Sequence, residues 1–134
     1  MTTLSRKASC SCGQLSAVAT GEPVRVSMCH CVACQRRTGT VFGAQARYPE
    51  KSVLVSGESR AYSRTADSGH VLTFNFCPAC GGTVYYTNDA LPGFVGIPVG
   101  TFADPSFNAP AFSVYERTKH PWVALPAGLE RSQS

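Results

Sequence analysis

The chain has 134 residues, of which 43% are hydrophobic and 15% are charged, and its formal net charge is +4. This balance is typical of a globular domain and excludes a disordered chain. No apolar run is long enough to form a membrane-spanning helix, and the basic residues form no stripe that would predict nucleic-acid binding. We therefore expect one domain over residues 1–134, with its core between about residue 8 and residue 125.

The first ten residues, "MTTLSRKASC", include basic residues but no apolar segment of the kind found in a secretory signal. This predicts a cytoplasmic location, where thiols stay reduced. In that compartment closely spaced cysteines indicate a metal site or catalysis more often than disulfides. The seven cysteines of the chain are therefore the main clue to its function.

The first predicted element is an extended segment that carries Cys10 and Cys12. Residues two apart on a strand point to the same side, so both thiols are expected to face one metal ion. Gly13 follows directly and can take the positive φ angle that a turn around a metal favours. This pair needs a second pair of cysteines from elsewhere in the chain.

The stretch "CHCVACQRRTG" places Cys29, Cys31 and Cys34 within six positions, at the start of the one short helix that the sequence predicts, over residues 32–37. Three thiolates without an obvious fourth ligand are typical of a catalytic or exchanging zinc site with one open position. A redox-active pair of Cys31 and Cys34 is the alternative, but no βαβ pattern surrounds it.

Three histidines are candidates for the open position on this metal. In extended backbone His30 points away from the neighbouring cysteines, so we expect it to face solvent or to support the site from outside rather than to bind metal. His70 and His120 would have to be brought there by the fold.

Arg36 and Arg37 follow two and three residues after Cys34. Guanidinium groups bind carboxylates in a bidentate manner, so at least one arginine is a candidate for binding the carboxylate of a small thiol near the metal. The alternative is that both are solvated side chains on the short helix. The single tryptophan, Trp122, is expected to pack in the fold rather than to contact substrate.

The remaining elements are short strands separated by frequent turns. Two-residue alternation and β-branched or aromatic content predict strands over residues 51–56, 71–76, 82–87, 94–100 and 112–115. Nine prolines and twelve glycines would interrupt any long helix. We therefore predict an all-β architecture of sheets or a sandwich.

The stretch "FCPACGG" contributes Cys77 and Cys80 with the C-x-x-C spacing of a zinc knuckle, again followed by glycine. Together with Cys10 and Cys12 it would complete the closed four-cysteine set of a structural zinc site. Such a site would link the N-terminal strand to the middle of the chain.

The order of these motifs is specific: C-x-C-G, then C-H-C-x-x-C-x-R-x-x-G, then F-C-P-x-C-G, then a late G-T-F-A-D-P and a tryptophan. It resembles the glutathione-dependent formaldehyde-activating enzyme (GFA) family, also called the centromere-protein-V/GFA domain family. The resemblance extends from about Ala8 to Trp122. It implies a mainly β "tent" of the Mss4-like kind, made of short antiparallel strands and holding two zinc ions.

The resemblance also implies a role for each cysteine. The structural zinc would be held by Cys10, Cys12, Cys77 and Cys80, and the second, catalytic zinc by Cys29, Cys31 and Cys34. The family activity joins formaldehyde to glutathione and is classed as a carbon–sulfur lyase. The expected partners are a small thiol and a small aldehyde, not nucleic acid or a membrane. A non-catalytic zinc-ribbon-like interaction module or a glutathione carrier is the alternative, and the sequence does not determine the oligomeric state.

Overall fold

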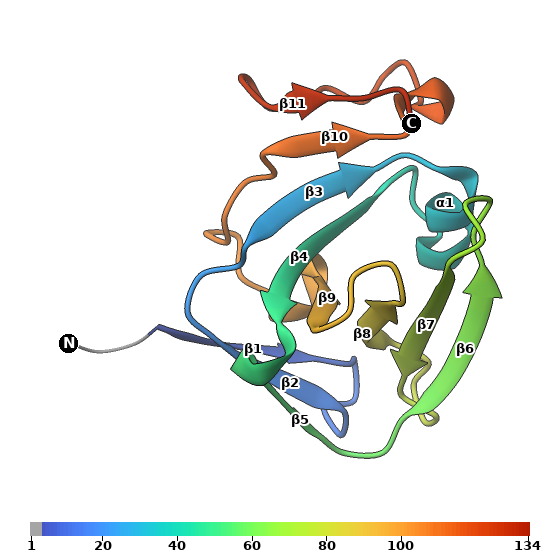
Figure 1. Ribbon diagram of the computed structural model, residues 1–134. Coiled ribbons are helices and arrows are strands. Elements are labelled where there is room, and N and C mark those ends of the chain that lie inside the picture. Colours follow the sequence, from blue (N-terminus) through green and yellow to red (C-terminus); the bar gives the residue numbers. More distant parts are fainter. Residues whose placement is uncertain (1–3) are drawn as a thin grey trace.

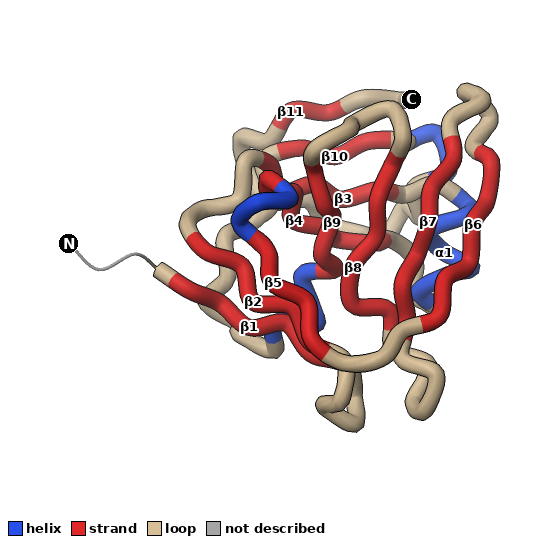
Figure 2. Tube along the Cα trace, turned by 60° about the horizontal axis from the view of Figure 1, so that its bottom comes forward, coloured by secondary structure: helices blue, strands red, loops and turns tan. Residues whose placement is uncertain are grey.

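The computed structural model describes residues 4–134 and consists mainly of short strands with little helix (Figures 1 and 2). Its strands are β1 (Ser5–Ser9), β2 (Ser16–Thr20), β3 (Arg25–Cys29), β4 (Gly43–Pro49), β5 (Val53–Ser56), β6 (Arg60–Thr65), β7 (Val71–Phe76), β8 (Thr83–Asn88), β9 (Phe94–Pro98), β10 (Phe112–Val114) and β11 (Glu130–Arg131). Its helices are α1 (Val32–Thr38) and the 3-10 helices η1 (Glu50–Ser52), η2 (Val99–Phe102) and η3 (Glu116–Thr118).

The strands form two sheets. The smaller has the order β1-β2-β5, and the larger has the order β11-β10-β3-β4-β9-β8-β7-β6. In Figure 1 the large sheet curves around, with α1 beside the β6–β7 end, and the small sheet lies across its lower side. Most strand pairs are antiparallel as expected, but β10 pairs in parallel with both β3 and β11. The expectation that all strands pair antiparallel is therefore wrong for these two pairs.

The hydrophobic core lies between the two sheets. Leu15, Ala17 and Ala19 come from the small sheet and its first turn, and they are fully buried. Ala46 and Tyr48 of β4 and Ile97 of β9 belong to the same buried cluster. Removing this apolar surface from water is the main stabilising contribution to the fold.

The opposite face of the large sheet lines a cavity. On β3 and β4, side chains alternate between the two faces, so Val26 and Ala46 face the core while Arg25, Ser27 and Gln45 line the cavity. A register shift occurs where β8 pairs with Asn75 and Phe76 of β7. An irregularity of this kind changes which side chains face each side.

The register shift has a direct effect on the site. Val84 and Tyr85 both pack in or against the core, and the next residue, Tyr86, lines the cavity. A regular strand would have placed Val84 and Tyr86 on the same side. The irregular pairing therefore places Tyr86 on the cavity side of the sheet.

The sequence predicted the mainly β fold correctly. The strand over 71–76 and the helix starting at residue 32 are confirmed, and the other four predicted strands are found with one or both ends shifted by one or two residues. The segments 51–52 and 99–100 form parts of 3-10 helices instead of strand. The expectation that Cys10 and Cys12 lie on a strand is wrong, because β1 ends at Ser9 and Cys12 lies in a turn. No helix among the described residues is long and apolar enough to span a membrane.

Candidate functional site

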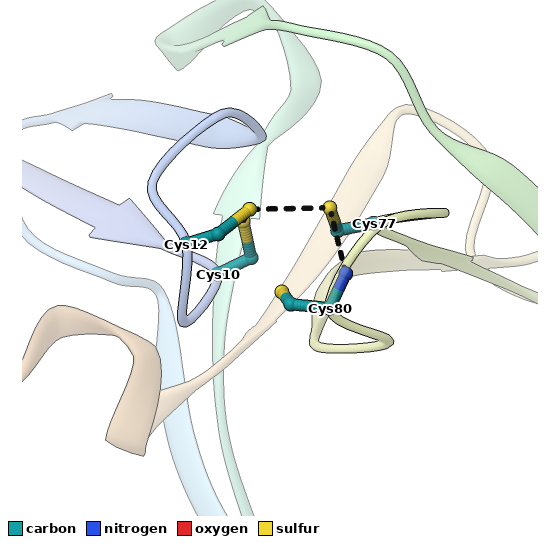
Figure 3. Close-up of side chains that lie close together, drawn as sticks. All are labelled: Cys10, Cys12, Cys77 and Cys80. Carbon is teal, nitrogen blue, oxygen red and sulfur yellow. Dashed lines mark hydrogen bonds between the residues drawn. The ribbon is translucent and has the colours of Figure 1, made fainter.

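The first group of cysteines, which we call the four-cysteine cluster, consists of Cys10, Cys12, Cys77 and Cys80. Figure 3 shows these side chains converging from two separate turns of the chain. Their sulfur atoms all lie within 4.8 Å of one another, and the Cys12 Sγ is 3.7 Å from the Sγ atoms of both Cys10 and Cys77. A tetrahedron with zinc–sulfur bonds of about 2.3 Å has sulfur–sulfur edges of about 3.8 Å, so the geometry fits zinc.

Two similar turns position these thiols. Gly13, with a φ of 86°, donates its N–H to the Cys10 carbonyl, and Gly81, with a φ of 81°, donates to the Cys77 carbonyl. Both glycines adopt the left-handed conformation that the sequence predicted for them. The Cys77 sulfur accepts further hydrogen bonds from the Cys80 N–H and from the Gln14 amide. Burial opposes ionisation of Cys77, but these hydrogen bonds lower its pKa to about 6.

The second group, which we call the three-cysteine cluster, consists of Cys29, Cys31 and Cys34. Cys29 ends β3, Cys31 is the N-cap of α1, and Cys34 lies one turn into that helix. The Cys31 sulfur accepts the Cys34 N–H at 3.2 Å, which starts the helix and turns Cys34 back towards its neighbours. The three sulfur atoms lie within 4.8 Å of one another.

The charges within the three-cysteine cluster also favour a cation. Hydrogen bonds from Cys29 and Cys34 lower the pKa of the Cys31 thiol to about 2, whereas the contact with Cys31 raises the pKa of Cys29. Without a metal, one thiolate at Cys31 is therefore stabilised by two protonated neighbours, and all three thiols can ionise together only when a positive ion lies between them. Among the described residues these are the two cysteine groups with metal-ligand geometry, and together they could hold two ions.

None of the histidines belongs to either cluster. His30 points away from the cysteines, as expected, but it does not face solvent: it is fully buried, and its Nε2 lies 2.9 Å from the Ser113 hydroxyl. His70 pairs with Asp89. His120 contacts the Gln35 side chain at 3.0 Å.

A cavity of about 700 Å³ opens beside the three-cysteine cluster, a volume typical of small-molecule sites. Its lining includes all three cysteines, the aromatic side chains of Phe74 and Tyr86, and five arginines. Burial raises the pKa of Tyr86 to about 12, so its hydroxyl stays protonated at neutral pH. The arginines are Arg25, Arg37, Arg47, Arg64 and Arg117.

Of the two arginines that the sequence singled out, the structure places one in the cavity. Arg37 lines it, with its guanidinium carbon 4.7 Å from the centre of the Phe74 ring. Arg36 is exposed and is not among the cavity-lining residues. Trp122 is 72% exposed, so the expectation that it packs in the fold is wrong.

Sequence reasoning missed most of the cavity wall. Arg25 and Ser27 precede Cys29 at two-residue intervals, so recognising β3 would have placed them on the same face as this cysteine. Arg47 and Tyr86 become neighbours of the site only through strand pairing and the irregularity in β8. Sequence spacing alone carries no signal for those two residues.

With the site described, comparison with known proteins identifies the family. The model of the family described as "Glutathione-dependent formaldehyde-activating enzyme" (GFA) matches residues 5–118. The chain belongs to this family. The match includes all seven cysteines of the two clusters, and membership together with these clusters supports metal binding in both. No curated protein matches the chain.

A solved structure shares the fold of this GFA-family chain. It is the crystal structure of a Rhodobacter sphaeroides protein, which is 20% identical in sequence and has a TM-score of 0.57. The alignment covers 76% of the present chain and 90% of the other. At this level of identity the similarity supports the fold alone.

Proposed function

We propose that this protein is a zinc-dependent carbon–sulfur lyase of the GFA type, which joins glutathione or a similar small thiol to formaldehyde or another small aldehyde. The observation that carries the proposal is the position of the three-cysteine cluster in the wall of a large cavity lined with arginines. A purely structural metal site has no need of such a cavity. The four-cysteine cluster contributes no residue to its lining.

The proposed cofactor is Zn²⁺ in both clusters. Cys10, Cys12, Cys77 and Cys80 would fill four positions and close the first site, whereas Cys29, Cys31 and Cys34 would leave one position of the second site free. Zinc held by three thiolates would bind an additional thiol in its deprotonated form at neutral pH.

The residues of the chain would then orient the reactants. Arg37 is held over Phe74 and offers a charged group to a thiol that carries a carboxylate. The protonated hydroxyl of Tyr86 faces the same cavity and can donate a hydrogen bond to the aldehyde oxygen. In the reaction a carbon–sulfur bond forms, the carbonyl double bond becomes a single bond, and the proton of the thiol ends on the oxygen.

The same arrangement fits a glutathione carrier that binds the thiol without turnover, and kinetics distinguish the two. We would first confirm two zinc ions per chain by metal analysis, and then follow formaldehyde and glutathione by exchange NMR spectroscopy. The enzyme should increase the rate of adduct formation above the spontaneous rate, and Cys31→Ser should abolish that increase. Binding without acceleration would favour the carrier, and a protein that binds no thiol would refute both.

We also propose that the protein acts in the cytoplasm on small molecules and has no nucleic-acid or membrane partner. The cavity supports the small-molecule part of this proposal, because its charged lining suits a small anionic ligand. A gel-shift assay with duplex DNA tests one part of it: no retardation at physiological salt is expected, and salt-sensitive binding would contradict it.

A further inference from the structure

Arg25 and Arg47 lie directly opposite each other on β3 and β4, and both line the cavity. Like charges in directly opposed positions destabilise an antiparallel strand pair. Among residues 4–134 neither arginine forms an ion pair; the three pairs found involve other residues. Asp67 is the acidic side chain among the lining residues. Among the described residues no carboxylate therefore lies within 4 Å of either guanidinium.

The surroundings of the pair increase the cost of leaving it without an anion. The Arg25 guanidinium lies over the Phe112 ring, 3.9 Å from its centre, and its buried Nε has no hydrogen-bond partner among the described residues. Burial and the charge of Arg25 lower the pKa of Arg47. A buried donor without a partner is unfavourable, so Arg25 is suited to receive an anionic ligand, and the guanidinium of Arg47 directly opposite adds a second positive charge.

Strand geometry sets the distance from this pair to the three-cysteine cluster. Cys29 and Arg25 are four residues apart on β3, which corresponds to about 13 Å between their Cα atoms. Between them lies the pair of Ser27 and Gln45, in which the Gln45 amide donates to the Ser27 hydroxyl at 3.4 Å. One face of the sheet thus presents thiols, then amide and hydroxyl groups, then two guanidinium groups.

From this order we infer that Arg25 and Arg47 form an anion-binding subsite that selects thiols whose carboxylate lies beyond an amide bond. The inference rests on the proposed function, because it assumes that a thiol binds at the three-cysteine cluster. The sulfur lies at the cysteines, the amide lies beside Ser27 and Gln45, and the carboxylate accepts bidentate hydrogen bonds from the arginines. Arg25 and Arg47 are specificity-determining residues in this arrangement, not catalytic ones.

The subsite distinguishes thiols by length as well as by charge. Mercaptoethanol has no carboxylate, and the carboxylate of free cysteine is too close to its sulfur to reach Arg25 while the sulfur is at Cys29. In glutathione each carboxylate is separated from the central cysteine by an amide bond. A short peptide spans roughly 3.3–3.6 Å per residue, so a thiol of this size can approach both ends of the cavity.

The test compares R25Q, R47Q and the double variant with R36Q, whose exposed arginine is absent from the cavity lining. The dissociation constant of each zinc-loaded protein is measured by calorimetry with glutathione, cysteine and mercaptoethanol. We expect glutathione to bind roughly 10–100-fold more weakly to the double variant, as expected for lost charge-assisted hydrogen bonds. Cysteine and mercaptoethanol should be unaffected, and R36Q should resemble the wild type with all three.

A second readout separates a binding role from a structural one. Because R47Q removes a like charge opposite Arg25, the ligand-free variant should melt at the same temperature as the wild type or higher. A residue needed mainly for folding would lower the melting temperature. Loss of glutathione affinity without loss of stability therefore supports the subsite, and a matching loss of both overturns it.

S-methylglutathione keeps both carboxylates but has no thiol, so it distinguishes failure of the subsite from failure of the proposed function. Unchanged glutathione binding in the double variant overturns the subsite and leaves the proposed function standing. Arginine-dependent binding of S-methylglutathione, with no gain in affinity from the free thiol, supports the subsite and overturns the proposed function. If neither compound binds to the wild type, both proposals are wrong.

Discussion

The two cysteine clusters use the same chemistry but are built differently. The four-cysteine cluster joins the turn after β1 to the turn after β7, and its contact between Cys12 and Cys77 spans 65 positions in the sequence. The three-cysteine cluster comes from one short stretch at the junction of β3 and α1. A metal in the first closes a long loop, whereas a metal in the second orders only a few residues.

The clusters also differ in what surrounds them. Around the four-cysteine cluster, the Gln14 side chain bonds both the Cys77 sulfur and the backbone of Glu58, so the neighbouring loops brace the site. The three-cysteine cluster opens into the arginine-lined cavity. From this comparison we expect the first site to stabilise the fold and the second to exchange a ligand. Four predictions test that division.

The largest difference is expected from removing one cysteine of each cluster. Cys77→Ser should unfold the domain, because structural zinc contributes folding free energy on the order of 10 kcal/mol in small zinc modules. Cys31→Ser should leave the domain folded, since it affects a locally formed site. Circular dichroism melts of both variants, expressed with ample zinc, measure the contrast. Equal loss of structure in the two variants would contradict the division of roles.

A smaller effect is expected at the loop that braces the four-cysteine cluster. Gly57 has a φ of 99°, and a side chain there would overlap the carbonyl group of Gln14. Gly57→Ala should lower the free energy of unfolding by about 3 kcal/mol, combining backbone strain with steric overlap. Urea denaturation measures this change.

Gly69→Ala is the matched control for that experiment. Gly69 has a similar φ of 91°, but a side chain there would meet no atom within 4 Å. This variant should lose about 1 kcal/mol from backbone strain alone. If the two variants lose the same stability, the contact between the Gly57 loop and Gln14 does not brace the cluster.

The next effect concerns the ion pair that joins the C-terminal strand β11 to η3, the helix whose Thr118 bonds the His30 carbonyl. The buried Glu116 carboxylate accepts hydrogen bonds from Arg131, at 2.7 Å from Nη2 and 3.0 Å from Nε, and these bonds lower the pKa of Glu116 to about 2. Glu116→Gln should lower the free energy of unfolding at pH 7 by about 2 kcal/mol. Urea titrations of both proteins measure the difference.

The pH dependence of that difference has a definite sign. The pKa of Glu116 is lower in the folded protein than its usual value of 4.5, so its stabilising contribution is complete above about pH 4.5. It is lost as the pH falls from 4.5 towards 2. The gap in stability between wild type and Glu116→Gln should therefore be constant from pH 7 to 5 and shrink below that range. A gap that widens on acidification would mean that the ion pair is not its source.

The sequence was most informative where chemistry and local spacing coincide. The grouping of the seven cysteines into two close pairs and a trio, the glycine turns and the helix starting at Val32 could be predicted because each depends on neighbouring residues. The convergence of Cys10 with Cys77 was predictable only because four sulfur ligands make a closed zinc site. The ligand number of zinc thus predicted a long-range contact that the hydrophobic periodicity of the sequence does not indicate.

The cavity wall was not predictable for the opposite reason. Arg47 approaches Arg25 only through the register of β4 with β3, and Tyr86 faces the cavity because the pairing of β8 is irregular. Neither fact has a local signature in the sequence. Arg36 and Arg37 were equivalent candidates by spacing, and only the orientation of α1 separates the exposed one from the one in the cavity.

The smallest effect is expected from a single neutral hydrogen bond behind the three-cysteine cluster. The Thr118 hydroxyl donates to the His30 carbonyl at 2.7 Å, and the Gln35 amide donates to the same oxygen at 3.0 Å. Because the second bond remains, Thr118→Val should cost no more than about 1 kcal/mol of stability. His30 lies between two of the cluster cysteines, so the loss should instead loosen the loop that carries these cysteines.

Release of zinc to a coloured chelator tests this local effect. If both clusters are loaded with zinc, the ions should be released in separate fast and slow phases, and Thr118→Val should accelerate only the fast phase, which we assign to the three-cysteine cluster. Thr101→Val is the matched control, because the Thr101 hydroxyl in η2 bonds the carbonyl of its N-cap Pro98 at 2.6 Å, and Thr101 belongs to neither cluster nor to the cavity lining. Both variants should lose similar stability, but the control should leave both phases unchanged. Faster release in the slow phase of Thr118→Val would show that the two clusters are coupled and do not act as independent sites.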